Sequence, residues 1–523
     1  MQPDTRIEPP FAILPRVIEA VTEAGNLIAA EFARPDGPRF SDHVTAPLDH
    51  EIEMILRDRL LALVPARFVG EEAGVLEAAT NESQSNGYCW VVDPHDGTRA
   101  FLEGRRGSAV SVALLRHGTP VLAAVHAPTS PDRGPDLIAW AEGGPITRDG
   151  KVVTIDLRDR ELAAEDVVFL NHGAWQRPVW HGTACAPAGF MPLPSIAYRL
   201  ARIAVGDGIA TLTLRPVNAL DIAAGHALLM AAGGVLLAED GVPVTYNDLG
   251  ESRPSACFGG SPRAVEALRA RTWRGSQEPR REARVTLSWP RRVPEPLLDR
   301  AAGCLFGLAI GGDLGPETEL GVIVARSLVG RTDYDRAAVD DAVAAWVASS
   351  GEIDRTSPRV RAIAIGIWAR DPEAAAAAAR LDCPDAAGNP ALAAAIAAGI
   401  QGVALSDMPD EIRRLAEAGG APPLAAAIAA GVQAAARTDP REARLWAGAP
   451  ETQAAGTWTS AVAGALAGAT SGRSVFPAPQ VMRVLTWRPE AGLGVARPRP
   501  ETCWTDDLVD LAEALLCQGQ RLL

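Results

Sequence analysis

The chain has 523 residues and a formal net charge of −14, and 47% of its residues are hydrophobic. Its length predicts two to four domains, and its hydrophobic content is sufficient to bury their cores. The acidic balance argues against nonspecific nucleic-acid binding, which depends on a basic surface, and no segment has the roughly 18 unbroken apolar residues of a membrane span.

The N-terminal segment and the cysteines bear on the compartment. The first six residues lack the basic-then-apolar order of a signal peptide. The seven cysteines are scattered and contain no Cys-x-x-Cys pair. An odd, unclustered set fits reduced thiols better than disulfides or a zinc site, so we expect a cytoplasmic protein.

Two helices are expected at the start of the chain. Apolar residues recur at helical spacing over residues 11–33, and a second amphipathic helix is expected over residues 51–63. Asp49 precedes this second helix, where it can serve as an N-cap.

An apolar strand over residues 67–70 follows, and it ends in the adjacent acids Glu71 and Glu72. Such a pair is ordinarily solvated. At a strand end beside other acids, a bound cation would offset the repulsion between the two carboxylates.

The most informative stretch is residues 90–101, Trp-Val-Val-Asp-Pro-His-Asp-Gly-Thr-Arg-Ala-Phe. An apolar strand leads to the carboxylates of Asp93 and Asp96, and a Gly-Thr pair then opens a helix. Pro94 lacks a backbone N–H, so the chain is expected to turn there rather than continue a strand ladder. Hard oxygen ligands beside the amide groups of a helix start predict Mg²⁺-assisted phosphate chemistry.

The rest of the first half alternates strands and helices. We expect a β-hairpin of residues 109–115 and 121–126, a helix over residues 196–205 and a strand over residues 209–214. Asp221 then opens a helix that ends at residues 233–234, in a position where an acid is ordinarily a cap. Arg105 and Arg106 are expected in a solvated loop, with contact to a substrate phosphate as the alternative.

Residues 93–98, Asp-Pro-His-Asp-Gly-Thr, resemble the Asp-Pro-x-Asp-Gly-Thr signature of the inositol monophosphatase superfamily of Mg²⁺-dependent, lithium-sensitive phosphomonoesterases. Residues 70–72 resemble its Gly-Glu-Glu segment. Residues 220–225 resemble its Trp-Asp-x-Ala-Ala-Gly segment, with Leu220 in place of Trp. Asp49 matches the Asp of a Val-Thr-x-x-Asp motif if one residue is inserted. The resemblance covers about residues 10–270 and implies a layered α-β-α-β-α sandwich.

The same resemblance implies a site for two Mg²⁺ ions, with a third left open. The implied ligands are Glu71, Asp93, His95 through its backbone carbonyl, Asp96 and Asp221. A metal-activated water would attack the phosphorus.

The implied catalytic residues are Thr98, Asp49 and Glu72. The Thr98 hydroxyl, oriented by Asp49, would position the water and accept its proton, and the Gly97 and Thr98 amides would hold phosphate oxygens. The expected substrate is a small phosphorylated metabolite. Residues 96–102 and the following hairpin favour the 3′-phosphoadenosine 5′-phosphate phosphatase branch, while an inositol phosphate or an ADP-ribose-related phosphate stays open.

The second half of the chain is expected to be a separate domain. We place the phosphatase domain at residues 1–275, a polar, proline-containing linker at residues 276–296 and an Ala-rich, all-α domain at residues 297–523. Residues 303–311 and 361–366 resemble segments of ADP-ribosylglycohydrolases, an all-α family with a dinuclear Mg²⁺ site.

Most of that family's metal ligands are missing. Glu317 and Thr318 are what remains of its Thr-Asp-Asp-Thr motif, and residues 455–458, Ala-Gly-Thr-Trp, stand where it has Asp-Thr-Asp-Thr. Residues 505–507, Thr-Asp-Asp, are interpreted as the cap of a C-terminal helix over residues 508–516. We therefore expect a pseudoenzyme domain that serves substrate capture, regulation or dimerisation, with a homodimer left open. The alternatives are a non-catalytic binding or regulatory protein, and an active ADP-ribosyl hydrolase in the second half.

Overall fold

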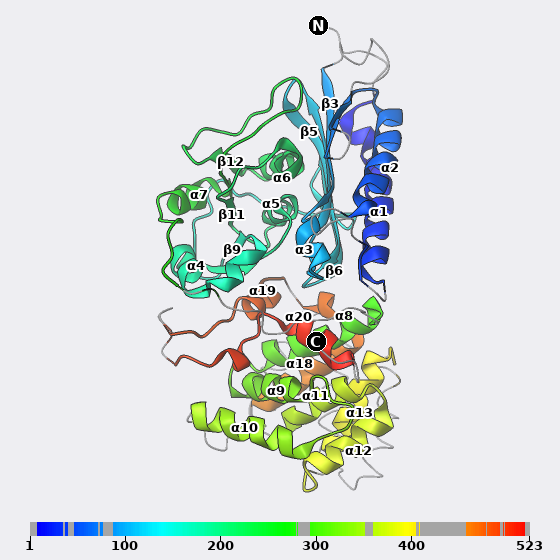
Figure 1. Cartoon of the computed structure of the whole chain (residues 1–523), viewed down its shortest axis with the longest axis vertical. Helices are drawn as coiled ribbons and strands as arrows, with labels where there is room; N and C mark the ends of the chain where they lie inside the picture. Colours follow the sequence, from blue (N-terminus) through cyan, green and yellow to red (C-terminus); the bar gives the residue numbers. More distant parts are fainter. Residues whose placement is uncertain are drawn as a thin grey trace. The chain divides into compact units, whose positions relative to one another are not determined.

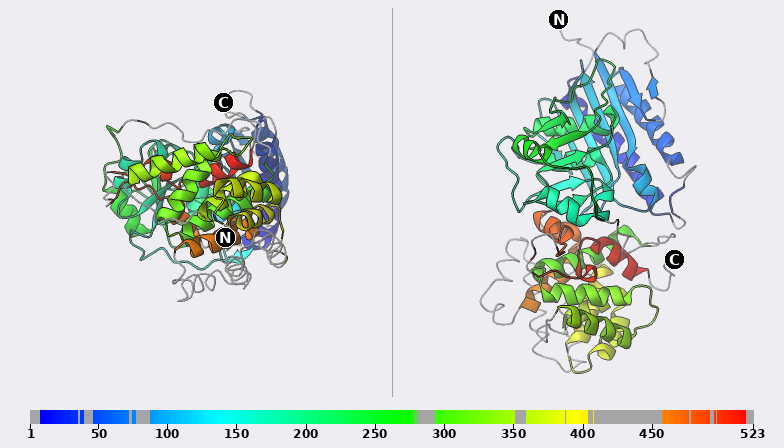
Figure 2. Two further views of the ribbon diagram at one scale, coloured as in Figure 1. Left: turned by 90° about the horizontal axis from the view of Figure 1, so that it is seen from below. Right: turned by 60° about the vertical axis from the view of Figure 1, so that its left-hand side comes forward.

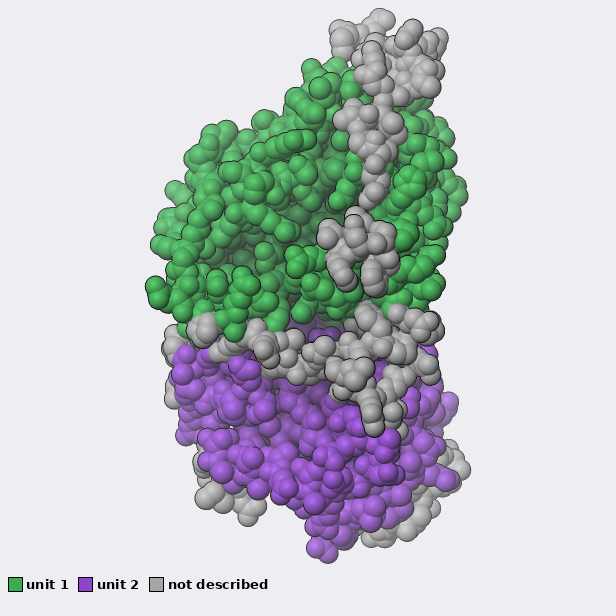
Figure 3. Space-filling view, viewed as in Figure 1, with its two compact units in different colours: residues 1–131, 135–282 green, residues 132–134, 283–523 purple. Residues whose placement is uncertain are grey.

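The structure is a computed structural model that describes residues 8–34, 37–39, 46–71, 74–76, 87–278, 280, 293–350, 359–386, 388–403, 407, 457–476, 478–491, 495 and 497–517. It divides into two compact units, one of residues 1–131 and 135–282 and the other of residues 132–134 and 283–523 (Figure 3). The proposed linker, residues 276–296, lies largely outside the described residues.

The first unit contains two β-sheets and the helices that cover them (Figure 1). Its helices are α1 (Pro10–Phe32), α2 (Pro47–Leu63), α3 (Thr98–Leu102), α4 (Pro178–Cys185), α5 (Ile196–Ala204), α6 (Ala219–Ala231) and α7 (Pro262–Arg269), with a 3₁₀ turn at His172–Gln176. The 8-stranded sheet has the order β2-β1-β3-β4-β5-β6-β7-β8, and the 5-stranded sheet has the order β10-β9-β11-β13-β12. The strands of the larger sheet are β1 (Arg67–Gly70), β2 (Gly74–Leu76), β3 (Tyr88–Asp96), β4 (Ala109–Arg116), β5 (Thr119–Ser130), β6 (Gly134–Ala141), β7 (Thr147–Arg148) and β8 (Lys151–Val152). Those of the smaller sheet are β9 (Val167–Leu170), β10 (Gly189–Pro192), β11 (Ala210–Thr213), β12 (Val235–Ala238) and β13 (Cys257–Gly260).

The elements of the first unit form layers. Helices α1 and α2 cover one face of the larger sheet, α5 and α6 lie between the two sheets, and α4 and α7 lie along the outer side of the smaller sheet (Figures 1 and 2). The layered α/β fold predicted for the N-terminal half is therefore confirmed.

The central strands have few polar residues because helices cover both of their faces. Strand β4 is buried at every position except its last, and β5 is buried at every position except its first. A sheet with two covered faces favours continuous apolar runs over strict alternation. The predicted hairpin is confirmed, with β4 and β5 antiparallel and a turn at His117 and Gly118, both of which have positive φ.

Three local predictions differ from the structure. Helix α2 begins at Pro47 rather than at residue 51, because proline is well suited to a first helical position. Ala46 holds the cap position, so the N-cap interpretation of Asp49 is wrong, and Asp49 lies in the first helical turn. Strand β3 does not end at Pro94: its ladder with β4 is irregular between Asp93 and Asp96 and pairs again at Asp96.

From residue 293 on, the described part of the second unit is helical, as predicted, and contains no strand. Its helices are α8 (Glu295–Gly311), α9 (Pro316–Leu328), α10 (Arg336–Ser350), α11 (Arg359–Ala369), α12 (Pro372–Asp382), α13 (Asn389–Ile400), α18 (Thr457–Ser471), α19 (Ala478–Leu485) and α20 (Leu508–Leu516), with 3₁₀ turns at Arg473–Val475 and Glu501–Cys503. Among the described helices of the chain, none is long and apolar enough to cross a membrane.

Helices α8 and α18 pack backbone against backbone. A Cβ atom on Gly307 of α8 would overlap the carbonyl oxygen of Gly464 of α18, and Gly303 and Gly468 meet in the same way one turn along. Only glycine allows helices to approach this closely, which explains the density of small residues in both segments.

Candidate active site

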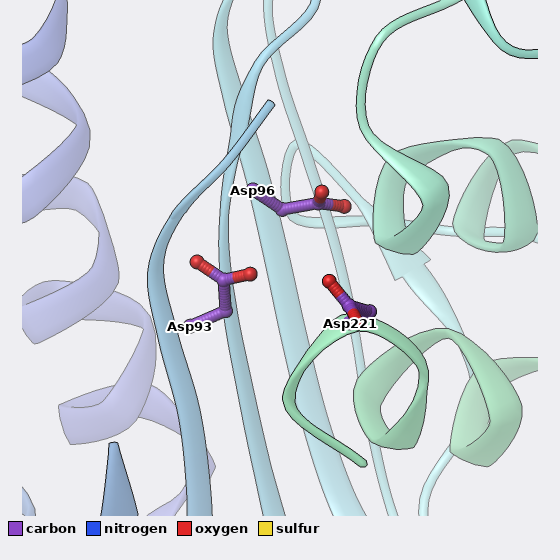
Figure 4. Close-up of side chains that lie close together, drawn as sticks. All are labelled: Asp93, Asp96 and Asp221. Carbon is purple, nitrogen blue, oxygen red and sulfur yellow. The ribbon is translucent and has the colours of Figure 1, made fainter. Parts of the chain in front are cut away.

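Three carboxylates from distant parts of the chain meet at one edge of the larger sheet. Asp93 and Asp96 lie at the end of β3, and Asp221 lies in the first turn of α6. One oxygen atom of each carboxylate lies within 4.8 Å of the others, and the three side chains point toward one another (Figure 4).

Backbone groups hold two of these carboxylates in place. Asp93 Oδ1 accepts a hydrogen bond from the His95 amide at 2.8 Å, across the irregular step of the ladder. Asp221 Oδ2 accepts from the Asn218 amide at 2.6 Å, as the acidic member of a capping box at the start of α6. The local structure that caps α6 thus also aims Asp221 at the strand end.

The third carboxylate is bound to a different helix. Asp96 Oδ2 accepts from the Ser195 hydroxyl at 2.6 Å and from the Ala197 amide at 2.8 Å, so it sits on the first turn of α5. Ser195 is itself the N-cap of α5 and accepts from the Tyr198 amide. The partial positive charge of a helix start favours the ionised form of Asp96.

Burial disfavours the charged forms of all three acids, and repulsion by neighbouring carboxylates adds to this effect for Asp93 and Asp96. Burial raises the pKa of Asp93 well above its usual range, and the charges of Glu71, Asp96 and Asp221 raise it further. Burial and the charge of Asp221 raise the pKa of Asp96 to about 6 in spite of its hydrogen bonds. Burial also raises the pKa of Asp221.

The donor set fits a divalent metal ion. Carboxylate oxygens are hard ligands of the kind that Mg²⁺ prefers. Arg199 acts on Asp96 and Asp221 only through its charge, and Arg215 does so on Asp221, so a cation bound among the three carboxylates would offset the repulsion that remains.

A hydrogen-bonded chain of side chains lies beside the three acids. The Thr98 hydroxyl donates to the His95 carbonyl at 2.7 Å and lies 3.2 Å from Asp49 Oδ2. The other Asp49 oxygen lies 2.8 Å from His95 Nδ1, and His95 Nε2 lies 3.0 Å from the Ser108 hydroxyl. The family resemblance implied that Asp49 orients Thr98, and in the structure these two side chains lie in contact.

The remaining predicted site residues are less closely gathered. Glu71 lies exposed in the turn after β1; its charge acts on Asp93, but it is not a member of the three-carboxylate group. Glu72 lies outside the described residues. Gly97 has a φ of 99° and precedes the first residue of α3, a conformation that glycine adopts without strain.

The inositol monophosphatase family matches this chain over residues 13–274. An inositol-1-monophosphatase of Rhizobium meliloti (strain 1021) is 30% identical over 241 residues, which cover 43% of this chain and 84% of that protein. The chain belongs to the inositol monophosphatase family.

Two further relatives have other names. The protein called Nus factor SuhB of Escherichia coli (strain K12) is 29% identical over 238 residues, 42% of this chain and 82% of that protein. The 3′(2′),5′-bisphosphate nucleotidase CysQ of the same organism is 31% identical over 159 residues, 30% of this chain and 61% of that protein. The family match ends at residue 274, and none of these relatives supports the expected resemblance of the second half to ADP-ribosylglycohydrolases.

Arg199 is a site residue of this inositol monophosphatase family member that sequence reasoning missed. It is fully buried in α5, and burial lowers its pKa to about 10. Its Nη1 donates to Thr211 Oγ1 at 3.1 Å and to the Leu212 carbonyl at 3.0 Å rather than to a carboxylate, although its charge acts on Asp96 and Asp221. Two arginines, Arg199 and Arg202, in a nine-residue helix whose other residues are apolar or aromatic were the available signal.

The acids of the second unit are paired with arginines instead. Asp507 accepts from Arg326 at 2.6 and 2.9 Å, and Asp506 Oδ2 accepts from Arg488 Nε at 2.8 Å. Asp507 holds the N-cap position of α20, as predicted, but its side chain makes no capping hydrogen bond. The arginines compete for the carboxylates more strongly than the helix amides do.

Glu319 of α9 is likewise engaged. It accepts from Trp346 Nε1 at 2.7 Å and from Arg499 Nε at 2.8 Å, and it is buried. Residues 455–456 lie outside the described residues. Within the described part of the chain, the one group of three or more acidic, His or Cys ligand atoms is the group in the first unit.

Proposed function

We propose that the first unit is a Mg²⁺-dependent phosphomonoesterase that acts on a small phosphorylated metabolite. The convergence of three carboxylates beside Thr98, two of them buried and the third half-buried, is the observation that carries this proposal. Family membership supports it, because two relatives are named as an inositol-1-monophosphatase and a bisphosphate nucleotidase.

Asp93, Asp96 and Asp221 would hold the metal, joined by Glu71 and the His95 carbonyl as the family resemblance implies. Bound Mg²⁺ would stabilise the negative charge that develops on the phosphate and acidify the attacking water. Two ions would neutralise the negative charge of the cluster more completely than one. Asp93 is repelled both by Glu71 and by the pair Asp96 and Asp221, so it can share a cation with either side.

Side-chain and backbone groups of the chain would then orient the attacking water and the phosphate. The Thr98 hydroxyl lies against the His95 carbonyl and Asp49 Oδ2, which leaves a lone pair of its oxygen for the attacking water. It would accept a proton from that water as its own hydrogen passes to the Asp49 carboxylate. The amides of Gly97 and Thr98, at the left-handed step before α3, would hold phosphate oxygens. Glu72 would act with these groups on the water.

The test is Mg²⁺-dependent phosphate release by the full chain from nucleotide 3′-phosphates, bisphosphate nucleotides, inositol phosphates and phosphorylated ADP-ribose. Asp93→Asn is expected to lower kcat by about 10³-fold or more, since metal-ion catalysis contributes several kcal/mol. Asp58→Asn is the matched control, because Asp58 is an exposed acid of α2. Near-wild-type turnover by Asp93→Asn, or no release from any compound by the wild type, would overturn the proposal.

We propose a nucleotide 3′-phosphate as the preferred substrate.

A second candidate function is binding without catalysis, which the similarity to a protein named as a Nus factor favours. The same phosphate-release assay discriminates the two functions. For the second unit, we propose a pseudoenzyme role without a dinuclear metal site. The arginine pairing of Asp506, Asp507 and Glu319 supports it, and ADP-ribosyl hydrolysis by the full chain would contradict it.

A further inference from the structure

We propose that His95 is a positioning residue that holds the Asp49 carboxylate against Thr98 through hydrogen bonds that extend to Ser108. The inference rests on the proposed phosphatase function. It assigns a role to the His95 side chain, where the family signature leaves the position open and implies a role only for the backbone carbonyl.

The His95 ring is held on all sides. Its side chain is 0% exposed, and Asp49 and Ser108 lie at 2.8 and 3.0 Å from its two nitrogens. The ring also meets Phe101 of α3 edge-on, with centroids 4.4 Å apart and planes at 76°. A ring fixed at three points has one orientation.

The chemistry of the partners fixes the tautomer. An ionised carboxylate only accepts hydrogen bonds, so Nδ1 carries the hydrogen and donates to Asp49. In a neutral ring Nε2 is then an acceptor, and the Ser108 hydroxyl donates to it. In that form the hydrogen bonds run in one direction, from Ser108 through His95 to Asp49, at the distances observed.

The two oxygens of Asp49 therefore have separate tasks. Oδ1 is held by the His95 ring, and Oδ2 faces the Thr98 hydroxyl at 3.2 Å. Without the ring, a carboxylate that is 98% buried would lose its strongest donor and could turn about its terminal bond. Its alignment with Thr98, and thus the orientation of the hydroxyl toward water, would be lost.

Two substitutions separate the two ring nitrogens. In His95→Asn the amide nitrogen reaches the place of Nδ1 and keeps the bond to Asp49. In His95→Gln the amide reaches the place of Nε2 and keeps the bond to Ser108 only. Both variants bury an amide in place of the ring. If His95 only stabilised the fold, the kcat values of the two variants would therefore change by similar factors.

The experiment measures kcat and KM of the full chain for its best substrate, with unfolding midpoints of the metal-free proteins. His95→Gln is expected to lower kcat by about 10–100-fold with a smaller change in KM, the usual effect of removing an orienting partner, and His95→Asn to restore most of the loss. In a double-mutant cycle with Asp49→Asn, the midpoint shift of His95→Gln is expected to be smaller than in the wild-type background, since the two residues are in contact.

Equal kcat values for the two variants, or additive midpoint shifts, would overturn the role of His95. Absence of phosphate release from the wild type would instead overturn the proposed function, and the unfolding cycle would still report whether His95 and Asp49 are coupled.

Discussion

Replacing Asp96 with asparagine is expected to stabilise the metal-free protein while abolishing phosphate release. Burial and the nearby charge of Asp221 raise the pKa of Asp96 to about 6 from the usual 3.8. This difference corresponds to about 3 kcal/mol between the two protonation states. Asparagine carries no charge, and its oxygen can still accept from Ser195 and Ala197.

The sign of the effect follows from the raised pKa. Because the folded protein binds the Asp96 proton more tightly than the unfolded chain does, the stabilising contribution is full below about pH 4 and is lost as the pH rises through about 6. The gain from Asp96→Asn is therefore expected to be about 3 kcal/mol near pH 8 and small near pH 4.

The assay is urea unfolding of the full chain in EDTA at both pH values, with Asp58→Asn as an exposed control. Mg²⁺ is expected to stabilise the wild type more than the variant, because it binds the folded carboxylate cluster. A variant that is less stable than the wild type at both pH values, or equally changed at both, would refute the electrostatic reasoning.

Three further predictions concern other parts of the molecule. Gly307→Ala is expected to lower the free energy of unfolding of the second unit by about 1–3 kcal/mol, measured by denaturant titration, because its Cβ would overlap the Gly464 carbonyl; an unchanged midpoint would contradict the close crossing of α8 and α18. Arg499→Ala is expected to cost about 3 kcal/mol in the same titration, since it leaves the buried Glu319 carboxylate without its ion pair; Arg499→Lys should recover part of the loss. Millimolar Li⁺, a hard cation that competes for carboxylate oxygens, is expected to inhibit Mg²⁺-dependent phosphate release, and complete insensitivity would weaken the metal assignment.

Local sequence patterns predicted the elements of the fold well where one physical signal dominated. Apolar spacing placed α1 and the β4–β5 hairpin within a few residues, because burial on a known period determines them. The start of α2 was predicted four residues too late. The prediction followed the apolar spacing alone and did not use the preference of proline, here Pro47, for the first helical position.

Long-range pairing could not be predicted from local sequence. Asp507 stands where a cap is expected, but Arg326, which is distant in the sequence, takes its carboxylate. Likewise, nothing near Asp96 in the sequence shows that Ser195 would bind it. The family motif supplied Asp221, because a capping acid and a metal ligand at a helix start look the same in a single sequence.

The most direct test of the central claim is a crystal of the full chain grown or soaked with Mn²⁺ in place of Mg²⁺ and measured at a wavelength where manganese scatters anomalously. Anomalous peaks are expected among Asp93, Asp96 and Asp221, at about 2.1 Å from their carboxylate oxygens, and these peaks should be lost in Asp93→Asn. Full metal occupancy elsewhere, with none between these three side chains, would contradict the central claim.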